Sequence, residues 1–333
     1  MLQFILFTHD DLDGVGCKVV YELAHQHLKK GVDYDVVNCT NGNIDDQVMK
    51  YLNGGNINKD TEITFADIVA SRENLEYIVN NFSVPKIFDH HRTNFFATWV
   101  VPDAVIVPEN ELGVMQSGTS LIYQHYSALA ESCPNDRRGD FTRKSKENQE
   151  LLANFVDTIR SYDTYEWKTT NNIEAKKLQT LFTLLGVDIF SQCYIDRLIN
   201  DKSYDLISKN DIKFVDAKIN NEQRIIDSVT PDDVYQFELR GLKCAFSLGS
   251  FGVNISELSY QFLSKYTEFD VFIGFSMWRG GELSFRCIRD DLDLGKDFAL
   301  PIGGGGHPKA AGAMIDETLR EEIVQKLICF MNK

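Results

Sequence analysis

The first half of the chain alternates short apolar runs with helical patterns, and this alternation limits the fold more than any other feature. The apolar runs at residues 3–8, 34–37, 62–66 and 86–88 indicate strands. A helical pattern over residues 15–30 follows the first of them. Strands that alternate with helices at this spacing predict an α/β fold, in which a mainly parallel sheet is flanked by helices.

The second half of the chain has a different pattern. Residues 172–227 are almost entirely helical in pattern and largely polar, which suits a connector between two lobes. The last hundred residues predict a smaller α+β domain. Its expected elements are strands near residues 234–237, 242–248, 271–277 and 282–286 and helices at residues 255–265 and 317–331.

The charge balance argues against a protein that grips long duplex nucleic acid. Among 333 residues, 34 are Lys or Arg and 49 are Asp or Glu, so the net charge is −15. Duplex binding through phosphates requires a basic face. No stretch of basic residues interleaved with stacking aromatics is evident either. A small anion could still bind with the help of a metal or a few focused basic groups.

The cysteines and the apolar runs bear on cellular location. Seven cysteines are scattered without a C-x-x-C pair, so we expect reduced thiols and no disulfide framework. No apolar run approaches the ~20 residues that cross a bilayer. The chain starts without a basic segment, so we expect no signal peptide. These observations predict a cytoplasmic protein with no membrane contact.

Carboxylates and histidines follow three of the predicted strands. They are the segment His9-Asp10-Asp11-Leu12-Asp13-Gly14, then Asp67, then Asp89-His90-His91. Ligands of open parallel sheets bind at the carboxyl ends of strands, so these groups should converge. A helix N-cap accounts for one aspartate but not for the whole set. A mixed His/Asp set suits Mn²⁺, Mg²⁺ or Fe²⁺, and its size suggests two ions, as in sites that transfer phosphoryl groups to water.

A glycine run near the end of the chain is the second concentration of unusual residues. Residues 301–312 read PIGGGGHPKAAG and do not match the P-loop pattern. A helix beginning after the run would direct backbone N–H groups at an anion. The alternative is a flexible loop.

With these motifs in view, the chain resembles the DHH/DHHA1 family of phosphoesterases, named for the triplet Asp89-His90-His91. The ordered motifs are His9-x-Asp11-x-Asp13-Gly14, Asp67, the triplet, Asp163 in SYDTYEW, and GGGGHPKAAG at 303–312. The H-x-D-x-D-G spacing is more similar to the nano-RNase B type of oligoribonuclease than to the nano-RNase A type. The resemblance implies a DHH catalytic domain over residues 1–190, a helical linker over 191–228 and a DHHA1 substrate-binding domain over 229–333.

The resemblance also implies residue roles. The implied metal ligands are His9, Asp11, Asp13, Asp67, His90 and Asp163. Asp67 would bridge two ions, Asp89 would hold a ligand histidine in its tautomer, and His91 would meet the phosphate or protonate the leaving oxygen. The implied substrate contacts are Arg92, Arg286, Gly304, Gly305, Gly306 and His307.

Several of these assignments have plain structural alternatives. Asp163 lies among aromatic residues and could be a buried hydrogen-bond acceptor. Arg286 could be an ordinary surface arginine, and Arg289 competes with it for the phosphate. The basic segment 133–148 is either a solvated loop or a flap that touches substrate.

The function implied by the resemblance is a manganese-dependent phosphodiesterase, with Mg²⁺ or Fe²⁺ as alternative ions. It would hydrolyse very short RNA to nucleoside monophosphates. The alternatives are a phosphatase or phosphodiesterase for small nucleotides, such as 3′-phosphoadenosine 5′-phosphate or cyclic dinucleotides and their linear products, and a non-catalytic nucleotide sensor. A homodimer remains an alternative to a monomer.

Overall fold

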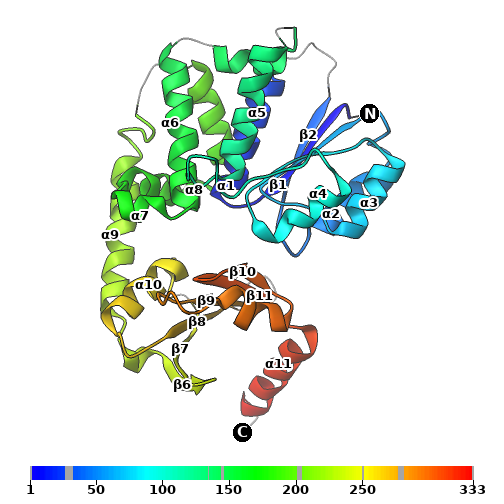
Figure 1. Ribbon diagram of the computed structural model, residues 1–333. Coiled ribbons are helices and arrows are strands. Elements are labelled where there is room, and N and C mark those ends of the chain that lie inside the picture. Colours follow the sequence, from blue (N-terminus) through cyan, green and yellow to red (C-terminus); the bar gives the residue numbers. More distant parts are fainter. Residues whose placement is uncertain are drawn as a thin grey trace. The chain divides into compact units, whose positions relative to one another are not determined.

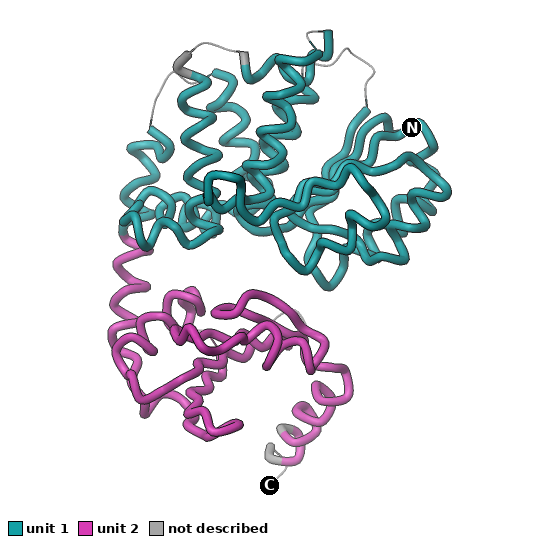
Figure 2. Tube along the Cα trace, in the orientation of Figure 1, with its two compact units in different colours: residues 1–216 teal, residues 217–333 magenta. Residues whose placement is uncertain are grey.

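The computed structural model describes residues 2–26, 33–133, 135–143, 146–200, 205–249, 251–276 and 281–331. The chain forms two compact units, residues 1–216 and 217–333 (Figure 2). The division falls inside helix α9 (Ile212–Ser228). The linker expected over residues 191–228 covers the end of one helix and the whole of α9, and its role as a linker stays a prediction.

The first unit is built on a parallel five-stranded sheet, as the alternating pattern predicts. Its order is β2-β1-β3-β4-β5, and every neighbouring pair is parallel. The short β5 was not expected from the sequence. The strands are β1 (Phe4–His9), β2 (Tyr34–Cys39), β3 (Glu62–Ala66), β4 (Lys86–Asp89) and β5 (Val105–Ile106).

Helices cover both faces of this sheet (Figure 1). Side chains alternate across a strand, so Ile5 and Phe7 of β1 join the core beneath α2, α3 and α4. Helices α1, α5, α6 and α8 lie on the other side. The helices of this unit are α1 (Leu12–His25), α2 (Ile44–Asn53), α3 (Arg72–Asn81), α4 (Ala97–Val100), α5 (Gly118–Ser132), α6 (Lys146–Asp163), α7 (Glu166–Thr170) and α8 (Ile173–Asn200).

Helix α1 begins earlier than the periodicity of residues 15–30 indicates. Asp11 is its N-cap, and the Asp11 side chain accepts a hydrogen bond from the Gly14 N–H at 3.0 Å. A capping carboxylate satisfies one of the N–H groups that lack a partner inside the helix. The expected helix positions 27–30 lie outside the described residues.

The basic segment 133–148 is partly engaged by the protein itself. Residues Arg137–Arg143 form a 3-10 helix, and Arg138 pairs with Glu62 at 2.7 Å and with Asp136 at 2.8 Å. Arg138 therefore fastens this segment to β3, which is a structural role. Lys144 and the side chains of Arg143 and Lys146 lie outside the described residues.

Helix α8 revises the expectation about apolar segments. By length and composition alone it could cross a membrane, and it is the one such helix among the residues described. Its backbone departs from helical geometry at Gly186, where φ is 72°. Its Tyr194 is buried and stacks on Phe155 of α6, with ring centroids 4.8 Å apart. Helix α8 therefore packs against α6 at this position.

The second unit is a six-stranded sheet in the order β10-β11-β9-β8-β7-β6. Only the β7–β8 pair is parallel within this described sheet. Helix α10 (Ile255–Lys265) packs on one face, and Phe298 contributes to a core on the other. The chain continues into α11 (Glu317–Met331). The strands are β6 (Tyr235–Leu239), β7 (Leu242–Leu248), β8 (Val271–Ser276), β9 (Glu282–Arg286), β10 (Gly305–His307) and β11 (Ala310–Met314). Residue 277 of the expected strand lies outside the described part.

Of the two alternatives for the glycine run, a helix that begins directly after it is contradicted by the described residues. Gly305–His307 form β10, which turns directly into β11 as an antiparallel hairpin. A Cβ at Gly304 would lie 2.2 Å from the Gly312 carbonyl oxygen, and Gly306 has a φ of 135°. The glycines are thus required by close backbone approach and a left-handed conformation, rather than by a helix N-terminus.

Two buried histidines make the first unit sensitive to acid. The Nδ1 of His25 lies 2.7 Å from the Tyr21 carbonyl oxygen. Burial lowers the pKa of His25 and of His125 to about 4, from an ordinary value of 6.5. Between pH 6.5 and pH 4, these histidines are therefore protonated in the unfolded chain but not in the folded chain. Their contribution to the free energy of unfolding is highest above pH 6.5 and decreases as the pH falls toward 4.

We expect His25 to lower the free energy of unfolding by about 2 kcal/mol between pH 7.5 and pH 5. Urea unfolding of the wild type and of His25→Phe at both pH values, each with chelator, measures the difference. The variant should lose less stability than the wild type. An equal loss in both proteins would contradict the assignment.

Candidate metal centre

The three parallel strand ends bring the predicted ligands to one edge of the first sheet. His9 ends β1, Asp67 follows β3, and His90 and His91 follow β4. In each of three groups, the ligand atoms all lie within 4.8 Å of one another. The groups are Asp67-Asp89-His90-His91, His9-Asp11-Asp67 and Asp13-His90-Asp163. The structure thus gathers all six residues expected as ligands, together with Asp89 and His91.

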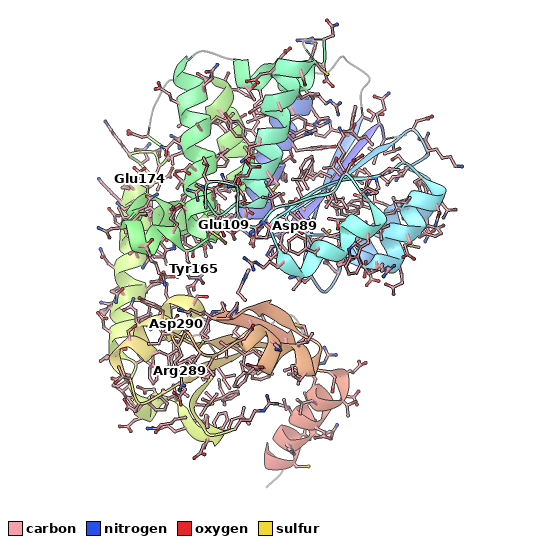
Figure 3. All side chains as sticks on the ribbon, in the orientation of Figure 1. Asp89, Glu109, Tyr165, Glu174, Arg289 and Asp290 are labelled. Atoms are coloured by element: carbon pink, nitrogen blue, oxygen red, sulfur yellow. The ribbon has the colours of Figure 1, made fainter. Side chains whose placement is uncertain are left out.

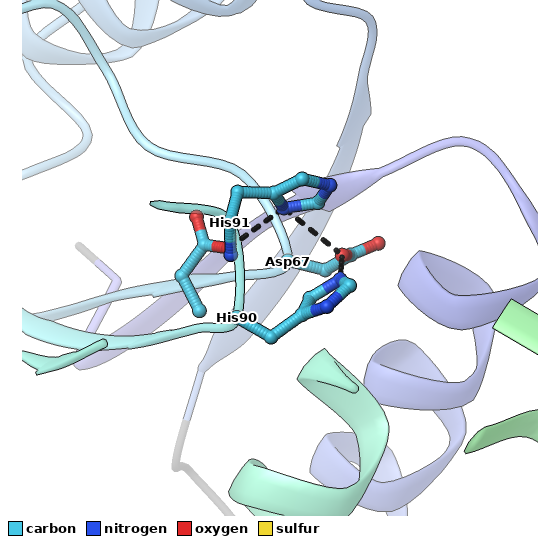
Figure 4. A group of neighbouring side chains, drawn as sticks. Asp67, His90 and His91 are labelled. Atoms are coloured by element: carbon cyan, nitrogen blue, oxygen red, sulfur yellow. Dashed lines mark hydrogen bonds and ion pairs between the residues drawn. The ribbon is translucent and has the colours of Figure 1, made fainter. Parts of the chain in front are cut away.

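His90 lies at the centre of this cluster. Its Nε2 is 3.3 Å from Asp67 Oδ1, 3.4 Å from Asp163 Oδ2 and 3.8 Å from Asp13 Oδ2. Figure 4 shows both His90 and His91 directed at the same Asp67 carboxylate. Asp163 therefore points at the cluster rather than serving only as an acceptor among aromatic side chains.

Two atoms in the cluster are buried without a hydrogen bond among the described residues. They are Asp67 Oδ2 and His90 Nε2. Buried polar atoms without a partner are rare because each one carries an uncompensated desolvation cost. Both atoms are of the type that binds a divalent cation, so the donor set fits metal ions.

The electrostatics of the cluster favour the same conclusion. Burial raises the pKa of Asp67 and of Asp163 well above the ordinary value, and the charges of Asp13 and Asp11 raise both further. Several carboxylates this close cannot all remain ionised unless positive charge enters. A divalent cation supplies that charge.

His9 and Asp11 form a close pair within the cluster. His9 Nδ1 lies 2.8 Å from Asp11 Oδ2. Burial alone would raise the pKa of Asp11, but the charge and hydrogen bond of His9 outweigh it and lower this pKa. Asp11 also caps α1, as expected for one aspartate of this motif, and its role as a metal ligand stays a prediction. A Cβ at Gly14 would lie 2.1 Å from the His9 carbonyl oxygen, which explains the glycine in the motif.

Helix α5 holds Asp13, and the sequence motifs contain no sign of this. The Gly118 and Thr119 N–H groups donate to the two Asp13 carboxylate oxygens at 2.6 and 3.0 Å, and the Thr119 hydroxyl donates to the Asp13 carbonyl at 2.7 Å. A helix N-terminus favours a carboxylate through its free N–H groups and its dipole. The reciprocal cap of Ser117 and Ser120 marks the helix start in the sequence, but not its partner.

Asp89 is fully buried and orients His91. Its Oδ1 accepts the His91 N–H at 2.9 Å and lies 2.8 Å from His91 Nδ1, while Oδ2 accepts from the Asn94 side chain at 2.6 Å. The histidine that Asp89 contacts is therefore His91, whereas the family resemblance implied a contact with a ligand histidine. Burial would lower the pKa of His91, but the hydrogen bond and charge of Asp89 raise it to about 9.

The residues expected to contact substrate lie in both units. Arg92 is exposed at the start of the 3-10 helix η1 (Arg92–Phe96), next to His91. In the second unit, Ala310 pairs with His307 on one side and with Arg286 on the other. Directly opposed residues of antiparallel strands share a face, so Arg286 and His307 flank Ala310 in one row.

Contacts in the second unit distinguish the two candidate arginines. The Arg286 guanidinium is held by the Ser256 hydroxyl at 3.0 and 3.1 Å and by the Ala311 carbonyl at 3.2 Å. Arg289 is instead ion-paired with Asp270 and Asp291. Its charge is neutralised locally, which favours Arg286 as the group that faces an anion.

Comparisons with known proteins agree with this geometry. No family model matches the chain. The chain is 27% identical to the oligoribonuclease NrnB of Bacillus subtilis strain 168 over 97% of this chain and 75% of that protein. Among solved structures it is similar to the DHH domain of a protein described as a member of a ribosomal-protein family, with a TM-score of 0.56, 13% identity and coverage of 100% and 87%.

A second solved structure, exonuclease RecJ bound to manganese, gives a TM-score of 0.52 at 13% identity, covering 99% of this chain and 90% of that one. Likeness at this identity shows a shared fold. Together with the converged Asp89-His90-His91 cluster and the relative that matches 97% of this chain, it agrees with the resemblance of the chain to the DHH/DHHA1 phosphoesterases, and among them to the nano-RNase B type.

Proposed function

We propose that the protein is a metal-dependent phosphodiesterase that hydrolyses very short RNA to nucleoside monophosphates. One observation carries the proposal: six ligand-type side chains meet at one sheet edge, around two buried atoms that make no hydrogen bond with the described residues. The similarity to an oligoribonuclease over 97% of the chain supports the substrate class. We further propose that it acts in the cytoplasm.

The metal ligands divide into two sets that share Asp67. His9 and Asp11 with Asp67 would hold one divalent ion, and Asp13, His90 and Asp163 would hold the other. Asp67 would join the second set as well, because its Oδ1 lies 3.3 Å from His90 Nε2. We favour Mn²⁺ because mixed imidazole and carboxylate sets suit it. Two such ions, when bound, provide a nucleophile at neutral pH and neutralise charge on the phosphate.

The surrounding residues orient the substrate and supply protons. Asp89 fixes the His91 ring and keeps it protonated, so that His91 can donate a hydrogen bond to a phosphate oxygen or a proton to the leaving oxygen. Arg92 adds positive charge next to it. In the second unit, His307, Arg286 and the backbone of Gly304–Gly306 would contact the end of the RNA.

The charge distribution predicts a preference for about two to five nucleotides. Each added nucleotide brings a phosphate into the field of a protein with a net charge of −15. In the basic segment, Arg137 pairs with Asp140 and Arg138 with Glu62 and Asp136, so these arginines do not form a free track. Among the described residues of this segment, phosphates beyond the metal centre would therefore meet little compensation.

Hydrolysis of labelled RNA of 2 to 24 nucleotides with Mn²⁺ tests the proposal, with 3′-phosphoadenosine 5′-phosphate and a cyclic dinucleotide as alternative substrates. We expect kcat/KM to fall beyond about five nucleotides and the fall to soften at higher salt. In the same assay, His307→Ala should raise KM, and a calorimetric titration with Mn²⁺ should show that this variant binds as many metal ions as the wild type. Faster turnover of either alternative substrate, or 24-mers cleaved as efficiently as dimers, would contradict the proposed substrate.

A further inference from the structure

We propose that Tyr165 forms a stacking subsite for a nucleobase next to the scissile phosphate. The inference rests on the proposed function and adds to it a residue that binds the base rather than the phosphate. Tyr165 lies on the turn between α6 and α7 (Figure 3). It follows Asp163, whose Oδ2 is 3.4 Å from His90 Nε2, by two residues. Two residues of chain span at most about 7 Å, so the ring is anchored beside the metal centre.

The backbone of Tyr165 is held in a conformation that disfavours a large side chain. Its φ is 61°, in the left-handed region where glycine or asparagine is the usual choice. Two hydrogen bonds fix it: its N–H donates to the Tyr162 carbonyl and its carbonyl accepts from the Lys168 N–H, both at 3.1 Å. Of the non-glycine residues described with positive φ in the first unit, Asp67 belongs to the metal centre and Asn171 is a tolerant type. A tyrosine in this disfavoured conformation therefore points to a use for its ring.

The ring surroundings match what single-stranded nucleic acids require. Tyr165 is 44% exposed. The Lys168 ammonium lies 5.2 Å from the Tyr165 ring centroid and 5.4 Å from that of Trp167. Trp167 itself stacks on Tyr162 at 5.8 Å, with 13° between the ring planes. The Lys168 ammonium lies over one face of the exposed Tyr165 ring, so a base would stack on the opposite face, and the ammonium would bring positive charge near a neighbouring phosphate.

The sequence pattern does not predict this subsite, because a single aromatic residue and a single lysine do not form a repeat. A strand-tracking protein repeats aromatic and basic residues along a groove. Here one ring and its neighbouring cation occur in SYDTYEWK, directly after a metal ligand. A single platform of this size suits a substrate of a few nucleotides.

Steady-state kinetics on the RNA dinucleotide pApA and on two analogues with an abasic ribose at the first or the second position tests the proposal. Tyr165→Asn removes the ring but tolerates the left-handed backbone, so the fold should be kept. Tyr165→Phe keeps the ring. Tyr77→Asn, a change at a tyrosine of α3 that is 41% exposed, is the matched control.

We expect Tyr165→Asn to raise the KM for pApA about 5- to 100-fold, the range for one stacked base. Tyr165→Phe and Tyr77→Asn should stay within about twofold of the wild type. For one of the two abasic analogues, the KM of Tyr165→Asn should equal that of the wild type. The base missing from that analogue is then the one that stacks on Tyr165. An unchanged KM for pApA in Tyr165→Asn, or an equal rise in KM on all three substrates, would overturn the subsite. Failure of the wild type to hydrolyse pApA would instead overturn the proposed function.

Discussion

Asp67→Asn should abolish hydrolysis of short RNA and at the same time stabilise the metal-free protein. The carboxylate belongs to the His9-Asp11-Asp67 group, and its Oδ1 lies 3.3 Å from His90 Nε2 of the other proposed ligand set, so its loss should disturb both ions. We expect kcat to fall by at least about 10³-fold, beyond the 10- to 100-fold typical of residues that only orient ligands. Without metal, the variant removes a buried carboxyl whose pKa is raised by burial and by Asp13 and Asp11. Repulsion is relieved, so the free energy of unfolding should rise.

The two readouts are measured separately, as turnover with Mn²⁺ and as urea unfolding with chelator. Asp35→Asn is the control, because this β2 carboxylate accepts from the Tyr51 hydroxyl, outside the cluster. It should keep full activity. Full activity of Asp67→Asn would contradict the bridging role, and a lower stability of that variant with chelator would contradict the electrostatic account.

Gly118→Ala should destabilise the protein and displace two ligands together. A Cβ at Gly118 would lie 2.5 Å from the Asp67 Cβ and 3.0 Å from the Asp67 backbone. The Asp67 backbone cannot easily shift away from the new Cβ, because its N–H donates to the Phe88 carbonyl at 2.9 Å and its φ is 63°. Overpacking of this kind costs about 1–3 kcal/mol. The Gly118 N–H also donates to the Asp13 carboxylate. A displacement of Asp13 and Asp67 by about 1 Å should therefore lower kcat about 10²-fold.

Thermal unfolding and steady-state kinetics measure these effects. Gly42→Ala is the matched control: its nearest neighbour would be the Thr40 hydroxyl, 3.8 Å from the new Cβ. Gly42→Ala should leave turnover unchanged. Wild-type activity of Gly118→Ala would show that α5 is not coupled to the ligand positions.

The sequence predicts the parallel sheet and the ligand edge because both follow from local rules. Strand ends of a parallel sheet converge, so His9, Asp67 and His90 could be grouped from the strand pattern alone. No local rule predicts that Gly118 and Thr119 reach Asp13, over a hundred residues away. That contact depends on how α5 packs, which is a property of the whole unit.

The structure of the glycine run could not be predicted from the local sequence. Consecutive glycines fit a helix N-terminus, a loop or a tight hairpin equally well, because glycine accepts many backbone conformations. Register decides among them: Gly305 pairs with Gly312 and His307 with Ala310. The choice between Arg286 and Arg289 likewise depends on neighbours distant in sequence, Ser256 and Asp270.

Electron paramagnetic resonance during a Mn²⁺ titration of the wild type tests the central claim most directly. We expect two ions per chain, magnetically coupled because two-metal sites hold them about 3.5–4 Å apart. Hydrolysis of pApA should rise with the coupled signal, and Asp67→Asn should lose the coupling. A single ion per chain at saturation, or two uncoupled ions with full activity, would contradict this claim.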